Sequence, residues 1–247
     1  MTSHPRKHRD GSLLTSGPPS ARDLIPHPLR KLHDAVTARA RESGAEALLL
    51  TGSTARGTRT AISDLDYHLV GEPIATDDLS AELDLHVVSA TVLNTRLGEG
   101  DDFTQWSLRF GCVVFDEGII KESIRLIDEK DLWPDPARKE QQARKSLSIA
   151  RAMMASGDHE AAVEQVRTAL TLIARWRLLE SRSFPLSRAE LPAQLEALGY
   201  MKLATGLAAT IHGAPPLAKL AAYVEAAHEL LDARPASMQG TTRSHAA

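Results

Sequence analysis

Alternating apolar and polar positions in the first half of the chain predict short β-strands. Residues 65–70 read Leu-Asp-Tyr-His-Leu-Val. Because strand side chains point alternately to the two faces of a sheet, Asp64, Asp66 and His68 share one face, opposite the apolar side chains. The apolar run at residues 48–50 comes before them and has the length of a buried strand. This region therefore predicts a small sheet with an acidic face.

A second alternating stretch adds a third carboxylate. Residues 83–88 read Leu-Asp-Leu-His-Val-Val, so Asp84 and His86 share a face. A neighbouring strand of the same sheet would bring Asp84 beside Asp64 and Asp66. Carboxylates at one place repel one another, and divalent cations such as Mg²⁺, which prefers oxygen ligands, offset that repulsion. Three carboxylates can hold two metal ions, the arrangement that clamps the attacking and leaving oxygens in phosphoryl-type transfer.

Helical spacing of apolar residues surrounds the strands and fills the second half of the chain. The first half carries predicted helices at residues 28–43, 91–97, 103–110 and 119–129, with a short strand at 112–115. After a break at 133–136 (Trp-Pro-Asp-Pro), helices are predicted at 137–155, 160–182, 201–211 and 217–231. One more helix is predicted to start at 185–187, because Ser187 and Glu190 match a capping box. Asp102 suits the N-cap of the helix that follows it.

The loop between the first two predicted strands holds residues suited to phosphate. Gly52 permits close backbone approach, and Ser53 offers a hydroxyl. Arg56 and Gly57 follow in the same loop. A glycine–serine turn for phosphate, placed near a carboxylate pair for metal, describes a nucleotide-triphosphate site. The glycine spacing is also that of a P-loop, but Thr58 stands where the lysine should be, so that interpretation fails.

Taken together, these motifs resemble the DNA polymerase β-type nucleotidyltransferase superfamily. The matching pattern is Gly52-Ser53, Arg56-Gly57, then Ser63-Asp64-Leu65-Asp66, and later Asp84. The likeness is greatest to the small bacterial branch, which includes aminoglycoside and lincosamide nucleotidyltransferases and the minimal nucleotidyltransferases of toxin–antitoxin pairs. The motif core spans residues 48–88, and the stretch at 106–116 is similar to actinobacterial members. The remaining chain adds a loose likeness to the helical C-terminal domains of antibiotic nucleotidyltransferases.

The resemblance implies a role for each matched position. Gly52 and Ser53 would hold the triphosphate, and Arg56 stands where a cation near the phosphates is expected. Two Mg²⁺ ions would be held by carboxylates, namely Asp64, Asp66 and Asp84. In this family the third carboxylate, here Asp84, either shares a metal or takes the proton from the acceptor hydroxyl.

Several residues have a second interpretation. Arg56 is equally well a plain surface charge. His68 and His86 share faces with the carboxylates, where they either tune the site or are structural. Asp116 ends a predicted strand, a place where site residues often occur, yet it also suits the cap of the following helix. Cys112 is expected in the core rather than as a nucleophile.

Composition limits the class of protein. The 247 residues allow one or two domains with a sizeable core, and the hydrophobic content of 43% is that of an ordinary globular protein. The net charge of −3 gives no global basic field, which argues against a nucleic-acid partner. The single cysteine fits a reducing cytoplasm, and no apolar run approaches the ~18 residues of a membrane span.

These observations predict an α+β fold in two domains. A small mixed β-sheet with flanking helices, the nucleotidyltransferase domain, is expected at residues 23–132. An α-helical bundle on the acceptor side is expected at 137–233. Residues 1–22 and 234–247 are expected to form tails without regular structure.

The expected activity is Mg²⁺-dependent transfer of a nucleoside monophosphate from an NTP, with ATP as the expected donor. The expected acceptor is a hydroxyl of a small molecule such as an aminoglycoside-type antibiotic, and pyrophosphate is released. The alternative is nucleotidylation of a protein or RNA partner, as in toxin–antitoxin regulators. On the helix at 137–155, Arg144 and Arg151 share a face, which either reaches the triphosphate or is simply solvated.

Overall fold

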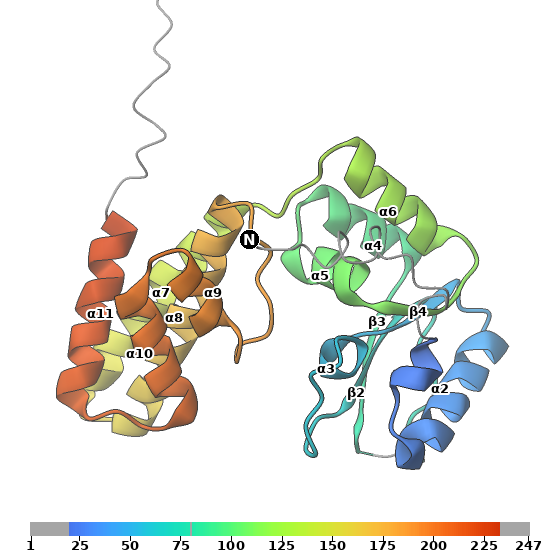
Figure 1. Ribbon diagram of the computed structural model, residues 1–247, viewed down its shortest axis with the longest axis horizontal. Helices are drawn as coiled ribbons and strands as arrows, with labels where there is room; N and C mark the ends of the chain where they lie inside the picture. Colours follow the sequence, from blue (N-terminus) through green and yellow to red (C-terminus); the bar gives the residue numbers. More distant parts are fainter. Residues whose placement is uncertain (1–19, 80, 233–247) are drawn as a thin grey trace, which may run out of the picture. The chain divides into compact units, whose positions relative to one another are not determined.

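A computed structural model describes residues 20–79 and 81–232 of the chain. The chain splits into two compact units, which meet in sequence at Asp135 and Pro136 (Figure 1). The first, here called the sheet unit, contains the described strands, and the second, the helical unit, contains only helices among its described residues. The α+β class predicted from the sequence is confirmed.

The sheet unit is built on a mixed sheet of four strands within the described residues. The strands are β1 (Ala47–Leu50), β2 (Leu65–Val70), β3 (Leu83–Val88) and β4 (Cys112–Asp116). Their order is β3-β2-β1-β4, in which β1 pairs antiparallel with β2 and β4, whereas β2 pairs parallel with β3. All four strands predicted from the sequence are therefore confirmed.

Helices cover both faces of this sheet (Figure 1). Leu65, Tyr67 and Leu69 are buried against α2 (Arg30–Glu42) and the short 3₁₀ helices η1 (Ala21–Leu24) and η2 (His27–Leu29). The opposite face, which carries Leu49 and Val70, packs against α4 (Ala90–Gly98), α5 (Asp102–Phe110) and α6 (Ile119–Glu129). The predicted alternation is confirmed, and Asp66 and His68 lie on the α4–α6 face.

Two details next to the strands differ from the sequence prediction. The predicted glycine–serine turn is a single helical turn, α3 (Gly52–Ala55). The predicted cap of α5 is wrong by one residue, because Asp101, not Asp102, accepts the N–H of Thr104 at 2.8 Å. Asp101 has the extended backbone that a cap requires, with φ −65° and ψ 120°, and Asp102 is already the first helical residue.

The helix predicted to begin at residues 185–187 begins later. The Ser187 hydroxyl does donate to the Glu190 carboxylate, at 2.5 Å, but this contact closes a turn that precedes the helix. The helix, α9 (Leu191–Ala197), has Pro192 in its first turn. Proline lacks an N–H and fits only at a helix start, which explains why the capping-box pattern is displaced from the helix.

The predicted tails fall mostly outside the described residues, which exclude 1–19 and 233–247. Residues 20–22 depart from the tail prediction, because they belong to the start of η1. The Ser20 side chain accepts the N–H of Asp23 at 3.3 Å, and Ala21 is buried. Burial of an apolar side chain together with a capping box gives this short segment a defined structure.

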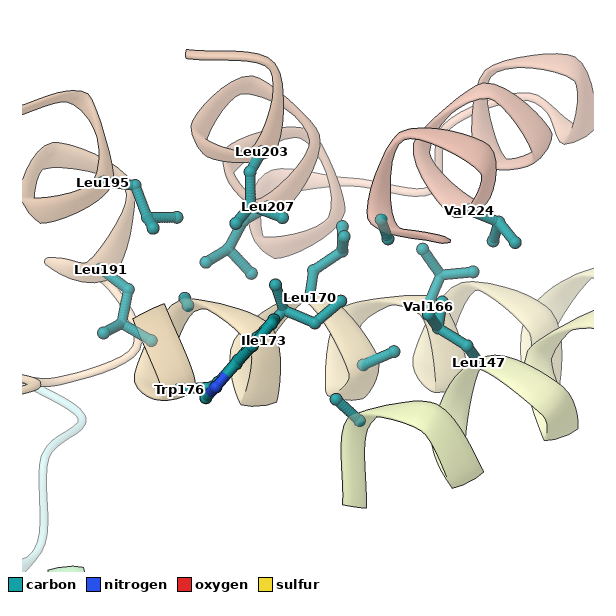
Figure 2. Close-up of a cluster of buried hydrophobic side chains, with 14 of the residues drawn as sticks. Leu147, Val166, Leu170, Ile173, Trp176, Leu191, Leu195, Leu203, Leu207 and Val224 are labelled. Carbon is teal, nitrogen blue, oxygen red and sulfur yellow. The ribbon is translucent and has the colours of Figure 1, made fainter. Parts of the chain in front are cut away.

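The helical unit contains five described helices. They are α7 (Pro136–Ser156), α8 (His159–Glu180), α9, α10 (Met201–His212) and α11 (Leu217–Asp232). The side chains Leu170, Ile173 and Trp176 of α8 point into a core that α9, α10 and α11 close from the other side (Figure 2). Among these described residues, and elsewhere in the described chain, no helix is long and apolar enough to cross a membrane.

The basic side chains predicted on α7 form ion pairs inside the helical unit. Arg144 contacts Glu140 at 2.9 Å and Asp232 at 3.1 Å, and Arg151 contacts Glu225 at 2.9 Å. These contacts link α7 to the acidic side of α11. The structure thus gives both arginines a structural role within the helical unit.

Asp116 acts as a cap. Its Oδ1 accepts the N–H groups of Gly118 and Ile120, both at 2.9 Å, and its Oδ2 accepts that of Lys121 at 3.0 Å. These are N–H groups of the first turn of α6 and of the turn before it, which lack partners within the helix. Of the two interpretations left open by the sequence, the structure supports the helix cap.

Asp116→Ala is therefore expected to lower the free energy of unfolding by about 1–2 kcal/mol, the usual cost of a lost cap. Glu117→Ala, at the exposed neighbouring position, is the matched control and should change stability by less than about 0.5 kcal/mol. Urea denaturation followed by circular dichroism measures both. Equal stability of the two variants would contradict the capping role.

Candidate active site

The three predicted carboxylates lie together where β2 and β3 begin, a place here called the carboxylate edge. The parallel register of β2 and β3 sets Asp66 directly beside Asp84, and Asp64 immediately precedes β2. Asp66 is half-buried, whereas Asp64 and Asp84 are exposed. The structure therefore brings together, from two strands, residues that are up to twenty positions apart in the sequence.

Charge on the central carboxylate is disfavoured. Burial raises the pKa of Asp66, and the negative charges of Asp84 and Asp64 raise it further, while Arg59 acts in the opposite direction. All three carboxylates ionised at one edge repel one another, so a bound cation would lower the electrostatic energy of this group. The site is thus electrostatically suited to a cation.

The start of α3 lies against the same carboxylate. The N–H of Thr51 donates to the carbonyl oxygen of Asp66 at 2.8 Å, which holds the loop to β2. Gly52 follows with φ +65°, and a Cβ at this position would lie 1.8 Å from Oδ2 of Asp66. Only glycine fits there, because it has no Cβ and adopts positive φ readily. The backbone next to Ser53 is consequently held beside the acidic group.

Arg59, which the sequence motifs did not single out, organises the loop between α3 and β2. Its guanidinium donates to the Asp64 carbonyl oxygen at 2.8 Å and to the hydroxyl of buried Thr54 at 3.2 Å. The motif pattern indicated Arg56 instead, whose guanidinium carbon lies 5.9 Å from the ring centroid of Phe110. Both arginines are in one polar loop, and nothing in their spacing reveals which one contacts the backbone before β2.

The two strand histidines, buried His68 and half-buried His86, form a pair next to the carboxylates. His68 and His86 face each other in the parallel register, with ring centroids 4.8 Å apart. Burial lowers the pKa of His68 to about 4, and the charges of His86 and Arg96 lower it further. His68 is therefore neutral at pH 7, so it adds no positive charge near the carboxylates.

The donor set suits Mg²⁺, which prefers a few carboxylate oxygens and completes its shell with water and substrate phosphates. Within the described residues, no group of three or more His, Cys, Asp or Glu side chains has the spacing of a metal centre. Asp64 and Asp84 are exposed. Ligation of metal by Asp64, Asp66 and Asp84 accordingly stays a prediction, which the raised pKa of Asp66 supports.

Comparison with known proteins adds little to this geometry. No protein-family model matches the chain, and no curated protein matches it either. A solved structure with a related arrangement is that of a nucleotidyltransferase-like protein from Exiguobacterium sibiricum 255-15. It has 17% sequence identity and a TM-score of 0.43, over 82% of this chain and 73% of that chain. Similarity at this level carries no argument about function, so the candidate site depends on its own geometry.

Gly52→Ala tests the close approach of α3 to β2. The new methyl group must displace the Asp66 carboxylate, and alanine at positive φ adds roughly 1–2 kcal/mol of backbone strain. Gly57→Ala is the matched control, because Gly57 has φ +71° but open space around its Cβ position. We expect denaturant unfolding to show a larger loss of stability for Gly52→Ala than for Gly57→Ala. Equal losses of stability would mean that the Asp66 carboxylate does not restrict the side chain at position 52.

Asp66→Asn tests the repulsion among the carboxylates. Because the pKa of Asp66 is raised in the folded protein, the ionised group destabilises the fold at pH 7, and this cost is relieved as the pH falls and the carboxyl becomes protonated. In buffer with EDTA the variant should therefore be more stable than wild type at pH 7, and the difference should shrink toward pH 4. Thermal unfolding of both proteins measures it. A variant less stable at every pH would contradict the electrostatic account.

Proposed function

We propose that the chain transfers a nucleoside monophosphate from an NTP, with ATP as the expected donor, to a hydroxyl group and releases pyrophosphate. One observation carries the proposal: the backbone at Gly52 lies against the Asp66 carboxylate, and Asp84 stands beside it on the parallel strand. This arrangement joins a loop suited to phosphate with a carboxylate group suited to Mg²⁺. Phosphoryl-type transfer needs both at one place.

The loop residues would bind the donor. The Ser53 hydroxyl and the neighbouring backbone N–H groups would donate to the terminal phosphates, and the short α3 would hold these groups in place. Arg56, on the same loop, would add positive charge near the phosphates. Hydrogen bonds to a charged group are each worth about 1.5–3 kcal/mol, so loss of the Ser53 hydroxyl should weaken NTP binding measurably.

The carboxylates would hold the cofactor and the acceptor. Two Mg²⁺ ions would bind to Asp64 and Asp66, with Asp84 as the third carboxylate, which either shares a metal or takes a proton; when bound, the ions would activate the acceptor oxygen and neutralise charge on the leaving pyrophosphate. Asp84 is exposed at the edge of the sheet, whereas Asp66 is confined by Gly52. This difference supports Asp84 as the group that takes the proton from the acceptor hydroxyl.

The proposed acceptor is a small hydroxyl compound, and aminoglycoside-type antibiotics are the first class to test. The resemblance of the motif core at residues 48–88 to antibiotic nucleotidyltransferases supports this choice. The helical unit contains a groove of about 420 Å³ between α10 and α11, but it is lined mainly by apolar and aromatic side chains, including Tyr200 and Tyr223. That lining does not suit a polycation, so the groove adds no support to this choice.

A protein acceptor is the second candidate, and one observation favours it over an RNA partner. Ile62, two residues before Asp64, is 93% exposed. It lies in a turn that Thr60 and Ser63 close, with the Thr60 N–H donating to the Ser63 hydroxyl at 3.0 Å. A protein acceptor would bury this side chain on contact, a gain that the charged backbone of an RNA acceptor does not offer.

Transfer is tested by incubating the protein with α-labelled NTPs, Mg²⁺ and a panel of acceptors, followed by mass spectrometry of the products. The panel contains aminoglycosides, other hydroxyl compounds, and a lysate that supplies protein and RNA. Asp64→Asn and Asp66→Asn should abolish transfer while the circular dichroism spectrum stays unchanged. Asp84→Asn should retain NTP binding but lose about 10²–10⁴-fold in rate, as expected for a lost general base.

Asp77→Asn is the matched control, because Asp77 is an exposed aspartate in the connection between β2 and β3. It should keep the wild-type rate. Wild-type turnover by the Asp64 or Asp66 variants would contradict the proposed site, and label on protein alone would replace the small-molecule acceptor by the second candidate. Loss of NTP binding in Asp84→Asn would make that residue a metal ligand rather than the base.

A further inference from the structure

The sheet face that carries Asp66 and Asp84 continues into a second group of side chains. One side-chain repeat further along the strands, His68 stands beside His86. Phe103, in the first turn of α5, contacts both imidazole rings. The nucleotidyl transfer proposed above assigns no role to this group.

Phe103 offers an aromatic face to solvent. Its ring stacks on that of His68 at 5.9 Å between centroids with an interplanar angle of 30°, and it meets the ring of His86 edge-on at 4.9 Å and 80°. His68 is 2% exposed, whereas Phe103 is 44% exposed. One side of the phenyl ring therefore packs on the histidines while a large part of it remains in water. An aromatic side chain fixed in this way is suited to stacking with another flat ring.

Arg96 of α4 places a positive charge next to this ring. Its guanidinium lies 3.1 Å from Nε2 of His86 and, because a guanidinium only donates, that nitrogen is the acceptor and the imidazole proton is on Nδ1. The partner of Arg96 is thus an uncharged imidazole. Within the described residues Arg96 forms no ion pair with a carboxylate. Its charge is therefore available to an anionic ligand.

We propose that Phe103 and Arg96 form a nucleotide-binding platform, in which the base stacks on Phe103 and a phosphate contacts Arg96. Both side chains contact the imidazole of His86, so the ring and the cation share one neighbouring side chain. A nucleotide carries both a flat ring and an anion in one molecule, which matches an aromatic ring and a guanidinium that contact the same imidazole. Stacking on an aromatic ring accepts any base, and a guanidinium binds phosphate through two N–H groups.

Two nucleotides of the proposed reaction carry the base and the phosphate that Phe103 and Arg96 would bind. It is either the donor NTP, with its base directed away from the triphosphate loop, or a nucleotide that serves as the acceptor. The use of the nucleotide in transfer rests on the proposed function, but its binding to Phe103 and Arg96 does not. A measurement of binding therefore tests the platform independently of turnover.

Fluorine NMR of the full chain labelled with 4-fluorophenylalanine provides that measurement, because the sequence contains only four phenylalanines. The resonance that disappears in Phe103→Leu is assigned to Phe103. Adenosine, ribose 5-phosphate, AMP and Mg²⁺-ATP are then titrated separately. We expect AMP or Mg²⁺-ATP to shift the Phe103 resonance more than adenosine does, and ribose 5-phosphate to leave it nearly unchanged.

Substitutions at Phe103 and at Arg96 measure the contributions of the aromatic ring and of the positive charge separately. Phe103→Leu, read by calorimetry, should weaken nucleotide binding by about 5- to 150-fold, the range that corresponds to one lost base–aromatic stack. Arg96→Gln should weaken binding of AMP but not of adenosine, and Arg96→Lys should restore part of it. Val92→Ala is the matched control, because Val92 is an exposed apolar side chain on the same helix as Arg96. It should leave binding unchanged.

Each outcome decides the proposal. A shift with AMP supports the platform and identifies an acceptor nucleotide, whereas a shift with Mg²⁺-ATP alone supports it and identifies the donor base. No shift with any nucleotide, or an equal shift with ribose 5-phosphate, overturns it, as does AMP binding that is insensitive to both Phe103→Leu and Arg96→Gln. If no transfer is detected but nucleotides still shift the Phe103 resonance, the proposed function is contradicted and nucleotide binding at Phe103 and Arg96 is still supported.

Discussion

The candidate site depends on the close approach of the loop after β1 to the Asp66 carboxylate. That approach is possible only because position 52 is glycine, where a Cβ would lie 1.8 Å from Oδ2 of Asp66. The hydrogen bond from the Thr51 N–H to the Asp66 carbonyl oxygen holds the two segments together. Parallel pairing of β2 and β3 then brings Asp84 to the same place. Two contacts distant in sequence thus define one acidic edge.

This edge lowers the stability of the protein without ligand. Asp66 is half-buried, its pKa is raised, and further carboxylates flank it, whereas a well-packed sheet of the same topology would carry apolar side chains there. Functional sites commonly contain groups that the fold alone would not favour. The pair His68 and His86 and the cation of Arg96 continue the same polar face. The face opposite, which contains Tyr67 and Leu69, forms an ordinary apolar core.

The sequence predicts those features that depend on local periodicity. Alternation with a period of two correctly assigns Asp66 and Tyr67 to opposite faces, and helical spacing finds α6 to the residue. It does not determine which strands pair or in which direction, because pairing depends on distant segments. The role of Arg59 depends on how the loop between α3 and β2 closes. The caps at Asp101 and Asp116 depend on the local backbone conformation at the start of each helix. For the same reason the Ser187–Glu190 pattern is correct as a contact and wrong as a helix start.

The central claim is that the loop at Gly52 and the carboxylate edge bind one Mg²⁺-nucleotide together. A crystal structure of the protein with Mg²⁺ and a non-hydrolysable ATP analogue tests it most directly. The account predicts the triphosphate against the backbone of Gly52 and Ser53, with metal density between it and Asp66. A nucleotide bound elsewhere, with Asp64, Asp66 and Asp84 in contact only with water, would contradict the account.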